Sequence, residues 1–131
     1  MIWRAPIFAL AALTASPVLA GPVKVPSGIA VTLHEVLLDE IMSEQWVRFR
    51  FIAPRLGSGA GQVSFDVAAI DMDYLCDATA VPYVRDHALN PARIVISLAD
   101  RVVPFGDRDP AATQFFGAYR LEDGRCIWEE F

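Results

Sequence analysis

Two early segments of the chain, residues 31–40 and 45–53, are interpreted as strands. Apolar and polar residues alternate along the second, with Val47, Phe49 and Phe51 set against Trp46, Arg48 and Arg50. A period of two residues is typical of a strand that buries one face. We therefore expect an antiparallel hairpin of these two segments, with residues 41–44 as its loop.

The expected register of this hairpin places Glu35 opposite Arg50 and Asp39 opposite Trp46 on the solvent side. On the core side it pairs Val36 with Phe49 and Leu38 with Val47.

Trp46, Arg48 and Arg50 would then form an exposed aromatic and basic stripe. Because Trp and Arg are enriched in binding hot spots, this stripe is a candidate partner-binding surface. The alternative is that the arginines are solvated and paired with Glu35 and Asp39.

A helical period follows in the middle of the chain and predicts a helix from Asp66 or Val67 to Ala80, ending before Pro82. Apolar residues recur at steps of three and four on one face, at Val67, Ile70, Tyr74, Ala78 and Val81. Three aspartates fall on the opposite face, at Asp66, Asp73 and Asp77.

Asp71 departs from this pattern, because it falls within the apolar arc of the predicted helix. A buried carboxylate must be paired, or its pKa rises. Asp71 could cap a helix that starts later, pair with Arg93, Arg101 or Arg120, or line a functional pocket. We treat it as a possible buried acid and leave these alternatives open.

The second half of the chain predicts further strands. Residues 93–98 are short, β-branched and apolar on both sides, which is typical of a central strand. Val102 and Val103 either continue this strand or return beside it. Asp109 followed by Pro110 predicts a short helix that ends near Gly117.

A two-residue turn at Asp123 and Gly124 predicts a hairpin at the end of the chain. Its register pairs Leu121 with Cys126, Tyr119 with Trp128 and Glu122 with Arg125. Cys126 then points toward the apolar side, where the covering helix could present Cys76. These are the only two cysteines, and no Cys-x-x-Cys motif is present, so we expect a structural disulfide rather than a free thiol or a metal pair.

The order of these elements, ββαβ(β)αββ, predicts an α+β fold. Its sheet is mostly antiparallel, with five or six strands, one longer helix and one short helix. We expect a single domain over residues 21–131, beginning with an extended lead-in over residues 21–28.

The first twenty residues have the layout of a cleaved secretory signal peptide. Arg4 precedes an apolar run over residues 5–13, and the segment ends in small residues at Ala20. A membrane anchor or a first core helix is the alternative, but Pro6 and Pro17 leave only a short apolar run between them. Together with the two cysteines, this segment predicts a periplasmic or secreted protein without a transmembrane segment after cleavage.

Composition and motifs exclude several function classes. The formal net charge of −5 over 131 residues argues against nucleic-acid binding. The glycine-rich stretch at residues 57–61 lacks the Lys of a phosphate loop and is interpreted as a flexible connector. His34 and His87 are more simply packed or exposed residues than members of a hydrolytic triad, and Asp73 and Asp77 more simply solvated than cation ligands. We expect no catalytic residue, no metal and no cofactor.

Several motifs together resemble a family of small exported alphaproteobacterial proteins of unknown function. They lie at residues 47–51, 94–98, 100–101, 105–106, 112–116 and 126–129. The resemblance covers nearly the whole mature chain and implies no assigned chemistry, so no catalytic residue follows from it.

The sequence therefore favours a non-enzymatic module that binds an envelope protein or a small ligand. Phe115, Phe116 and Phe131, near the C-terminal hairpin, could contribute an exposed apolar patch. The rival interpretation is a small periplasmic hydrolase or ligand-binding protein, with a pocket that holds Asp71 with His34, His87 or an arginine.

Overall fold

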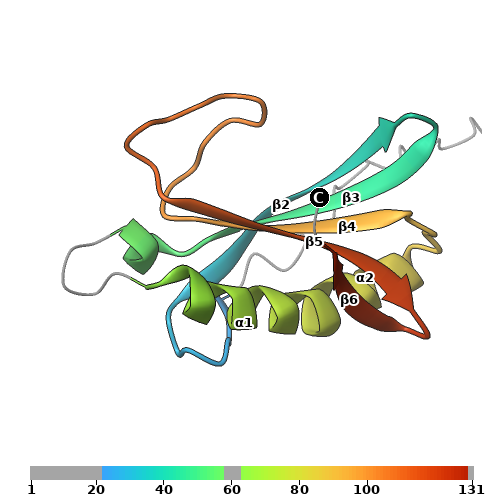
Figure 1. Cartoon of the computed structure of the whole chain (residues 1–131), viewed down its shortest axis with the longest axis horizontal. Helices are drawn as coiled ribbons and strands as arrows, with labels where there is room; N and C mark the ends of the chain where they lie inside the picture. The colour runs from blue at the N-terminus through green and yellow to red at the C-terminus, as the bar shows by residue number, and fades with distance from the viewer. Residues whose placement is uncertain (1–21, 58–62, 130–131) are drawn as a thin grey trace, which may run out of the picture.

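The chain forms one mixed sheet in which strands adjacent in sequence are also adjacent in space (Figure 1). The structure, a computed structural model, describes residues 22–57 and 63–129. Within these residues six strands are ordered β1 to β6 across the sheet. Their bounds are Pro22–Val23 (β1), Val31–Ile41 (β2), Glu44–Ile52 (β3), Arg93–Ala99 (β4), Gln114–Glu122 (β5) and Arg125–Glu129 (β6).

All strand pairs are antiparallel except β3 and β4, which are parallel. The chain crosses between these two strands through a helical layer on one face of the sheet (Figure 1). That layer comprises a 3₁₀ turn, η1 (Pro54–Gly57), and a continuous helix formed by α1 (Phe65–Leu75), η3 (Cys76–Ala80) and α2 (Val81–Asp86). The predicted α+β class and mostly antiparallel sheet are confirmed.

Both predicted hairpin registers are confirmed. In the first, Glu35 lies opposite Arg50, Asp39 opposite Trp46, Val36 opposite Phe49 and Leu38 opposite Val47. Leu38, expected on the core side, is nevertheless 58% exposed, so that part of the prediction is wrong. Its loop has two residues rather than four, because Met42 and Ser43 adopt positive φ angles and allow β2 and β3 to pair up to the turn. In the second, Leu121 pairs with Cys126, Tyr119 with Trp128 and Glu122 with Arg125.

The helix presents a different face to the sheet from the one predicted. Ala68, Asp71, Met72 and Leu75 are buried, whereas Val67, Ile70 and Tyr74, expected in the core, are exposed. The helix is thus rotated by one residue step, roughly 100°. The rotation is consistent with the pairing of Asp71 inside the protein and with the position of Cys76, which must face β6.

The helix also continues beyond Pro82, where we expected it to have ended. Residues 76–80 form a π-helical turn, in which the N–H of Val81 donates to the carbonyl of Cys76. Pro82, which has no backbone N–H to donate, follows this wider turn directly and lies in the first turn of α2.

The predicted short helix near the C-terminus is wrong. Asp109 does accept a hydrogen bond from the N–H of Ala111 at 2.9 Å, but only a turn forms. The chain then enters β5 at Gln114, which pairs with Ala99 of β4. Pairing along the central strand β4 therefore overrides the local helix signal. Val102 and Val103 neither continue β4 nor form a returning strand.

Some sequence predictions fall on residues outside the described ranges. The signal peptide at residues 1–20 lies there entirely, and the glycine-rich connector lies there from residue 58 onward. No helix among the described residues is long and apolar enough to cross a membrane.

Candidate functional site

The two faces of the sheet are covered differently. The helix covers one face, and the segment between β4 and β5, residues 100–113, leaves the sheet on the other side (Figure 1). This segment folds back over the outward-facing side chains of β3: the carbonyl of Val103 and the ring of Phe105 both contact Arg50. The contact leaves a recess between the segment and the open face of the sheet.

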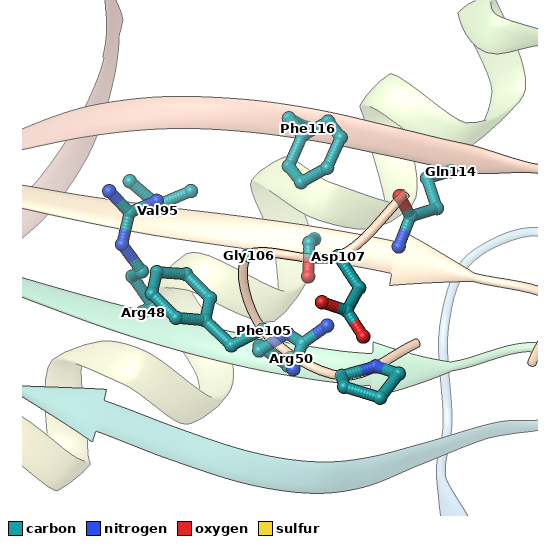
Figure 2. Close-up of a pocket in the computed structure, with 10 residues that line it drawn as sticks. Arg48, Arg50, Val95, Phe105, Gly106, Asp107, Gln114 and Phe116 are labelled. Carbon is teal, nitrogen blue, oxygen red and sulfur yellow. The ribbon is translucent and has the colours of Figure 1, made fainter. Parts of the chain in front are cut away.

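The recess has a volume of about 130 Å³. Figure 2 shows its arginines, aromatic rings and polar side chains around a common space. Three strands and the segment line it, through Arg48, Arg50, Val95, Ser97, Pro104, Phe105, Gly106, Asp107, Gln114 and Phe116. Val95 and Ser97 of β4 are buried and form its floor, while Phe105 and Phe116 are 55% and 56% exposed at its rim.

Arg50 is held in place by the protein itself. One terminal nitrogen donates to the carboxylate of Glu35, and the other donates to the carbonyl oxygen of Val103. Its guanidinium also lies 5.8 Å from the centre of the Phe105 ring. With 13% of its side chain exposed, Arg50 anchors residues 100–113 to the sheet.

Arg48 is held less completely. Its guanidinium lies 5.6 Å from the Trp46 ring and 5.3 Å from the Phe105 ring, both within cation–π range. Its Nε is 3.7 Å from a carboxylate oxygen of Asp39, which is too long for a hydrogen bond. This nitrogen is buried and has no hydrogen-bond partner among the described residues.

The predicted stripe of Trp46, Arg48 and Arg50 therefore lies on the open face of the sheet but is not freely exposed. All three residues are half-buried, and the arginines lie under Phe105. The ion pairs weighed as the alternative, Arg50 with Glu35 and Arg48 with Asp39, are both present. Sequence reasoning missed Phe105, because nothing local shows that this part of the chain folds back onto β3.

Asp71 is fully buried, at 0% exposure, and lies away from this recess. One carboxylate oxygen accepts the backbone N–H of Ser27 at 3.0 Å, and the other accepts the Ser27 hydroxyl. It does not cap α1, because Ser64 does. The arginines considered as partners form ion pairs elsewhere: Arg93 with Glu129, Arg101 with Asp100, and Arg120 with Glu122 and Glu129.

The two histidines are both exposed. His87 stacks on Tyr83 with ring centres 4.0 Å apart, and its Nδ1 lies 2.9 Å from the Tyr83 carbonyl oxygen. No group of three or more His, Cys, Asp or Glu side chains in the described part of the chain could hold a metal ion. A second recess beside the β2–β3 turn, of about 390 Å³ and more open to solvent, is lined by Leu38, Asp39, Glu40, Ser43 and Gln45, and Asp71 does not line it.

The helix is joined to the C-terminal hairpin on the far side of the sheet from the recess. Cys76 and Cys126 form a disulfide with their Cα atoms 6.1 Å apart. Nearby, the N–H of Cys126 donates to Asp77 at 2.9 Å, and the Tyr119 hydroxyl donates to Asp73 at 2.7 Å. Burial, together with the Asp73 carboxylate, raises the pKa of Tyr119 well above its usual value. These contacts secure the fold on the covered face of the sheet.

Of the three phenylalanines considered as an apolar patch, only Phe116 is exposed in the described residues. Phe115 packs edge-on against Phe65 of α1, with ring centres 5.5 Å apart. Phe131 lies outside the described ranges. The aromatic surface at the recess therefore combines Phe116 with Phe105, which comes from a different segment.

Residues 7–131 match the family model described as "Family of unknown function (DUF6497)", and the chain belongs to this family. The expectation of a family of unknown function is thereby confirmed. The bacterial group and the export of its members stay predictions. No curated protein and no solved structure matches the chain.

Proposed function

We propose that this member of DUF6497 is an exported binding module without a catalytic step of its own. Its binding surface is the open face of the sheet around the recess. One observation carries the proposal: two arginines of β3 converge with two exposed phenylalanines from separate segments. Arginine and aromatic side chains are enriched at binding surfaces, where they supply most of the binding energy.

The exposure of the aromatic rings supports a binding role. Phe105 and Phe116 remain more than half exposed, although the same chain buries Phe49 and Phe51 completely. Val102 of the same segment is also exposed. Exposed apolar groups that cluster beside charged ones are typical of interaction sites.

Two features support export. The first twenty residues have the layout of a signal peptide. The disulfide between Cys76 and Cys126 suits an oxidising compartment outside the cytoplasm. The partner in such a compartment is an envelope protein or a small ligand.

The rival proposal of a hydrolase pocket around Asp71 has less support. Both carboxylate oxygens of Asp71 already accept hydrogen bonds from Ser27, and the side chain is fully buried. A catalytic acid needs access to its substrate. We interpret Asp71 as a structural residue.

Site-specific photo-crosslinking in the native cell tests the binding surface. The photoreactive residue p-benzoylphenylalanine replaces Phe116 in one variant and Ile70 in a matched control. Both positions are exposed, but Ile70 lies on the outer side of α1. We expect a discrete crosslinked product, or a ligand adduct by mass spectrometry, from position 116 only. Equal products at both positions, or none at position 116, would reject this surface.

The export proposal has a separate test. The native protein is isolated from the periplasm or medium, and its N-terminus and thiols are analysed by mass spectrometry. We expect it to begin at Gly21, with both cysteines alkylated only after reduction. Native material that still carries residues 1–20, or that reacts before reduction, contradicts export.

A further inference from the structure

We infer that the recess binds a carboxylate attached to an aromatic or branched apolar group. The inference rests on the proposed binding surface and names the chemical class of its ligand. Two features of the recess carry it: an incompletely hydrogen-bonded arginine, and an apolar space beside it of suitable size.

The arginine is Arg48. The Nε of Arg48 is buried without a hydrogen-bond partner among the described residues, and the nearest carboxylate oxygen, on Asp39, is 3.7 Å away, so Asp39 does not fully satisfy this guanidinium. Its flat guanidinium presents parallel donors, which match the two oxygens of a carboxylate. The rings of Trp46 and Phe105 flank this guanidinium and restrict its orientation, so little freedom remains to be lost on binding.

Arg50 has a different part in the same site. Glu35 and the Val103 carbonyl already accept from its two terminal nitrogens. It therefore keeps residues 100–113, and with them Phe105, above the recess. The ligand's carboxylate is assigned to Arg48 rather than to Arg50.

The apolar part of the ligand fits the remaining lining. Val95 forms the buried floor, Pro104 and Phe105 one wall, and Phe116 the other. A volume of about 130 Å³ is comparable with the cavity of about 150 Å³ that accommodates benzene in an engineered protein. Stacking on two rings favours a flat or branched apolar group of this size.

The acidic groups around the recess limit the charge that it can accept. Glu35 is neutralised by Arg50, and Asp39 forms an ion pair with Arg48. Asp107 also lines the recess but is exposed. A ligand carboxylate therefore competes with Asp39 for Arg48, whose Nε is 3.7 Å from that side chain, and a cation drawn to Asp107 is the competing possibility.

Titration of the oxidised, ¹⁵N-labelled protein with four small probes tests the inference. Benzoate carries both features, benzamide lacks the charge, benzylamine reverses it, and acetate lacks the ring. The Nε–H resonance of Arg48, assigned by its loss in Arg48→Lys, reports a change in the environment of the guanidinium. We expect saturable shifts of this resonance and of the Ser97 and Phe116 amides with benzoate, and binding about tenfold weaker for the other three probes.

Two variants and two matched controls complete the test. Arg48→Lys keeps the positive charge but removes the parallel N–H donors of the guanidinium, and Phe116→Ser removes an exposed ring. Neither change leaves a large cavity in the core, so both variants are expected to fold. Each should weaken benzoate binding about tenfold. Arg85→Lys makes the same exchange, and Ile70→Ser a comparable loss of an apolar side chain, at exposed positions on the helix, and both should bind as the wild type does.

Three results would overturn the inference: no saturable benzoate shift at Arg48, equal binding of benzoate and benzamide, or tighter binding of benzylamine. A free acid and the C-terminus of a polypeptide share this chemistry. N-acetyl-alanyl-phenylalanine and its C-terminal amide separate them, because a site for polypeptide ends should bind the free-acid peptide more tightly than benzoate.

The photo-crosslinking experiment distinguishes this inference from the proposed function. Crosslinks at position 116 that excess benzoate does not reduce would leave the binding surface in place and reject the carboxylate. Absence of crosslinks together with absence of benzoate binding would reject both.

Discussion

Asp71 of α1 accepts hydrogen bonds from both the backbone N–H and the hydroxyl of Ser27, a residue 44 positions earlier in the chain. The Ser27 hydroxyl oxygen also accepts the N–H of Ile29 at 3.3 Å. These contacts join the segment before β2 to the helix on the covered face of the sheet. The Asp71 carboxylate, on the buried face of α1, thereby accepts hydrogen bonds from a residue of a turn that lies outside the strands.

Removal of either partner in this pair should destabilise the protein. We expect Asp71→Ala to lower the free energy of unfolding by about 2–3 kcal/mol and Ser27→Ala by about 1–2 kcal/mol, because each leaves polar groups unpaired. Urea denaturation of the single and double variants measures both effects and their coupling. Asp86→Ala, at an exposed position, is the control. Strictly additive losses would show that the two side chains do not interact.

The disulfide between Cys76 and Cys126 links residues 50 positions apart. In the chain-entropy model a loop of this length stabilises the folded state by about 4 kcal/mol. We expect Cys76→Ala/Cys126→Ala, and the reduced wild type, to unfold at correspondingly lower urea concentration. A reductant should not affect the double variant, which serves as its own control. Equal stability of the oxidised and reduced wild type would contradict the prediction.

Tyr119 should make stability depend on pH in the alkaline range. Burial and the Asp73 carboxylate raise its pKa in the folded protein, so the phenol stays protonated. Above about pH 10, the ordinary pKa of tyrosine, the unfolded chain loses this proton and the folded one keeps it. The unfolded state then binds fewer protons, and the free energy of unfolding falls as the pH rises.

Tyr119→Phe should remove this alkaline loss and cost about 1 kcal/mol at neutral pH, through the hydrogen bond to Asp73. Denaturation at a series of pH values measures both effects. Tyr74→Phe, at an exposed position on α1, should change neutral stability by less than about 0.5 kcal/mol. An unchanged alkaline limb in Tyr119→Phe would show that this phenol ionises equally in both states.

Asp100 should make the free energy of unfolding depend on pH in the acid range. Hydrogen bonds from Arg101, and then from the N–H of Thr113, lower the pKa of its carboxyl. Because the folded value lies below the unfolded value of about 3.9, this stabilisation is present above about pH 4. It is lost as the pH falls through the folded value.

We expect Asp100→Asn to flatten the acid limb of the stability profile, and Arg101→Gln to do so in part, because it removes the largest cause. Carbon-13 NMR titration of the Asp100 carboxyl measures the shift directly. A midpoint at or above the unfolded value in the wild type would contradict the prediction. The N–H of Asp100 also donates to the carbonyl of Thr113. The Asp100→Asn variant therefore also tests how these two residues hold the ends of the segment 100–113 together.

The successes of sequence reasoning share a physical basis. The registers of β2 with β3 and of β5 with β6 follow from alternation over neighbouring residues and from the geometry of the turns between them. The pairing of Cys76 with Cys126 followed from the second register together with the position of the helix. Each of these depends on interactions within a short stretch of chain or on a covalent bond between the only two candidates.

The predictions that were wrong depend on contacts between segments that are distant in sequence. The apolar residues of α1 allow more than one buried face, and distant contacts at Ser27 and Cys126 are consistent with only one of them. A strand partner on β4 overrides the helix signal at Asp109 and Pro110. The recess is equally non-local, because Phe105 reaches Arg48 and Arg50 from more than fifty residues away.

The sequence by itself determined the fold class, both hairpin registers and the cysteine pair, because local periodicity and turn chemistry are sufficient for these features. Only the tertiary structure decided which side of the helix is buried, how Pro82 is accommodated, and that the arginine stripe is partly covered. The reason is that burial is a property of the assembled chain: a side chain becomes buried when segments distant in sequence come to lie against it.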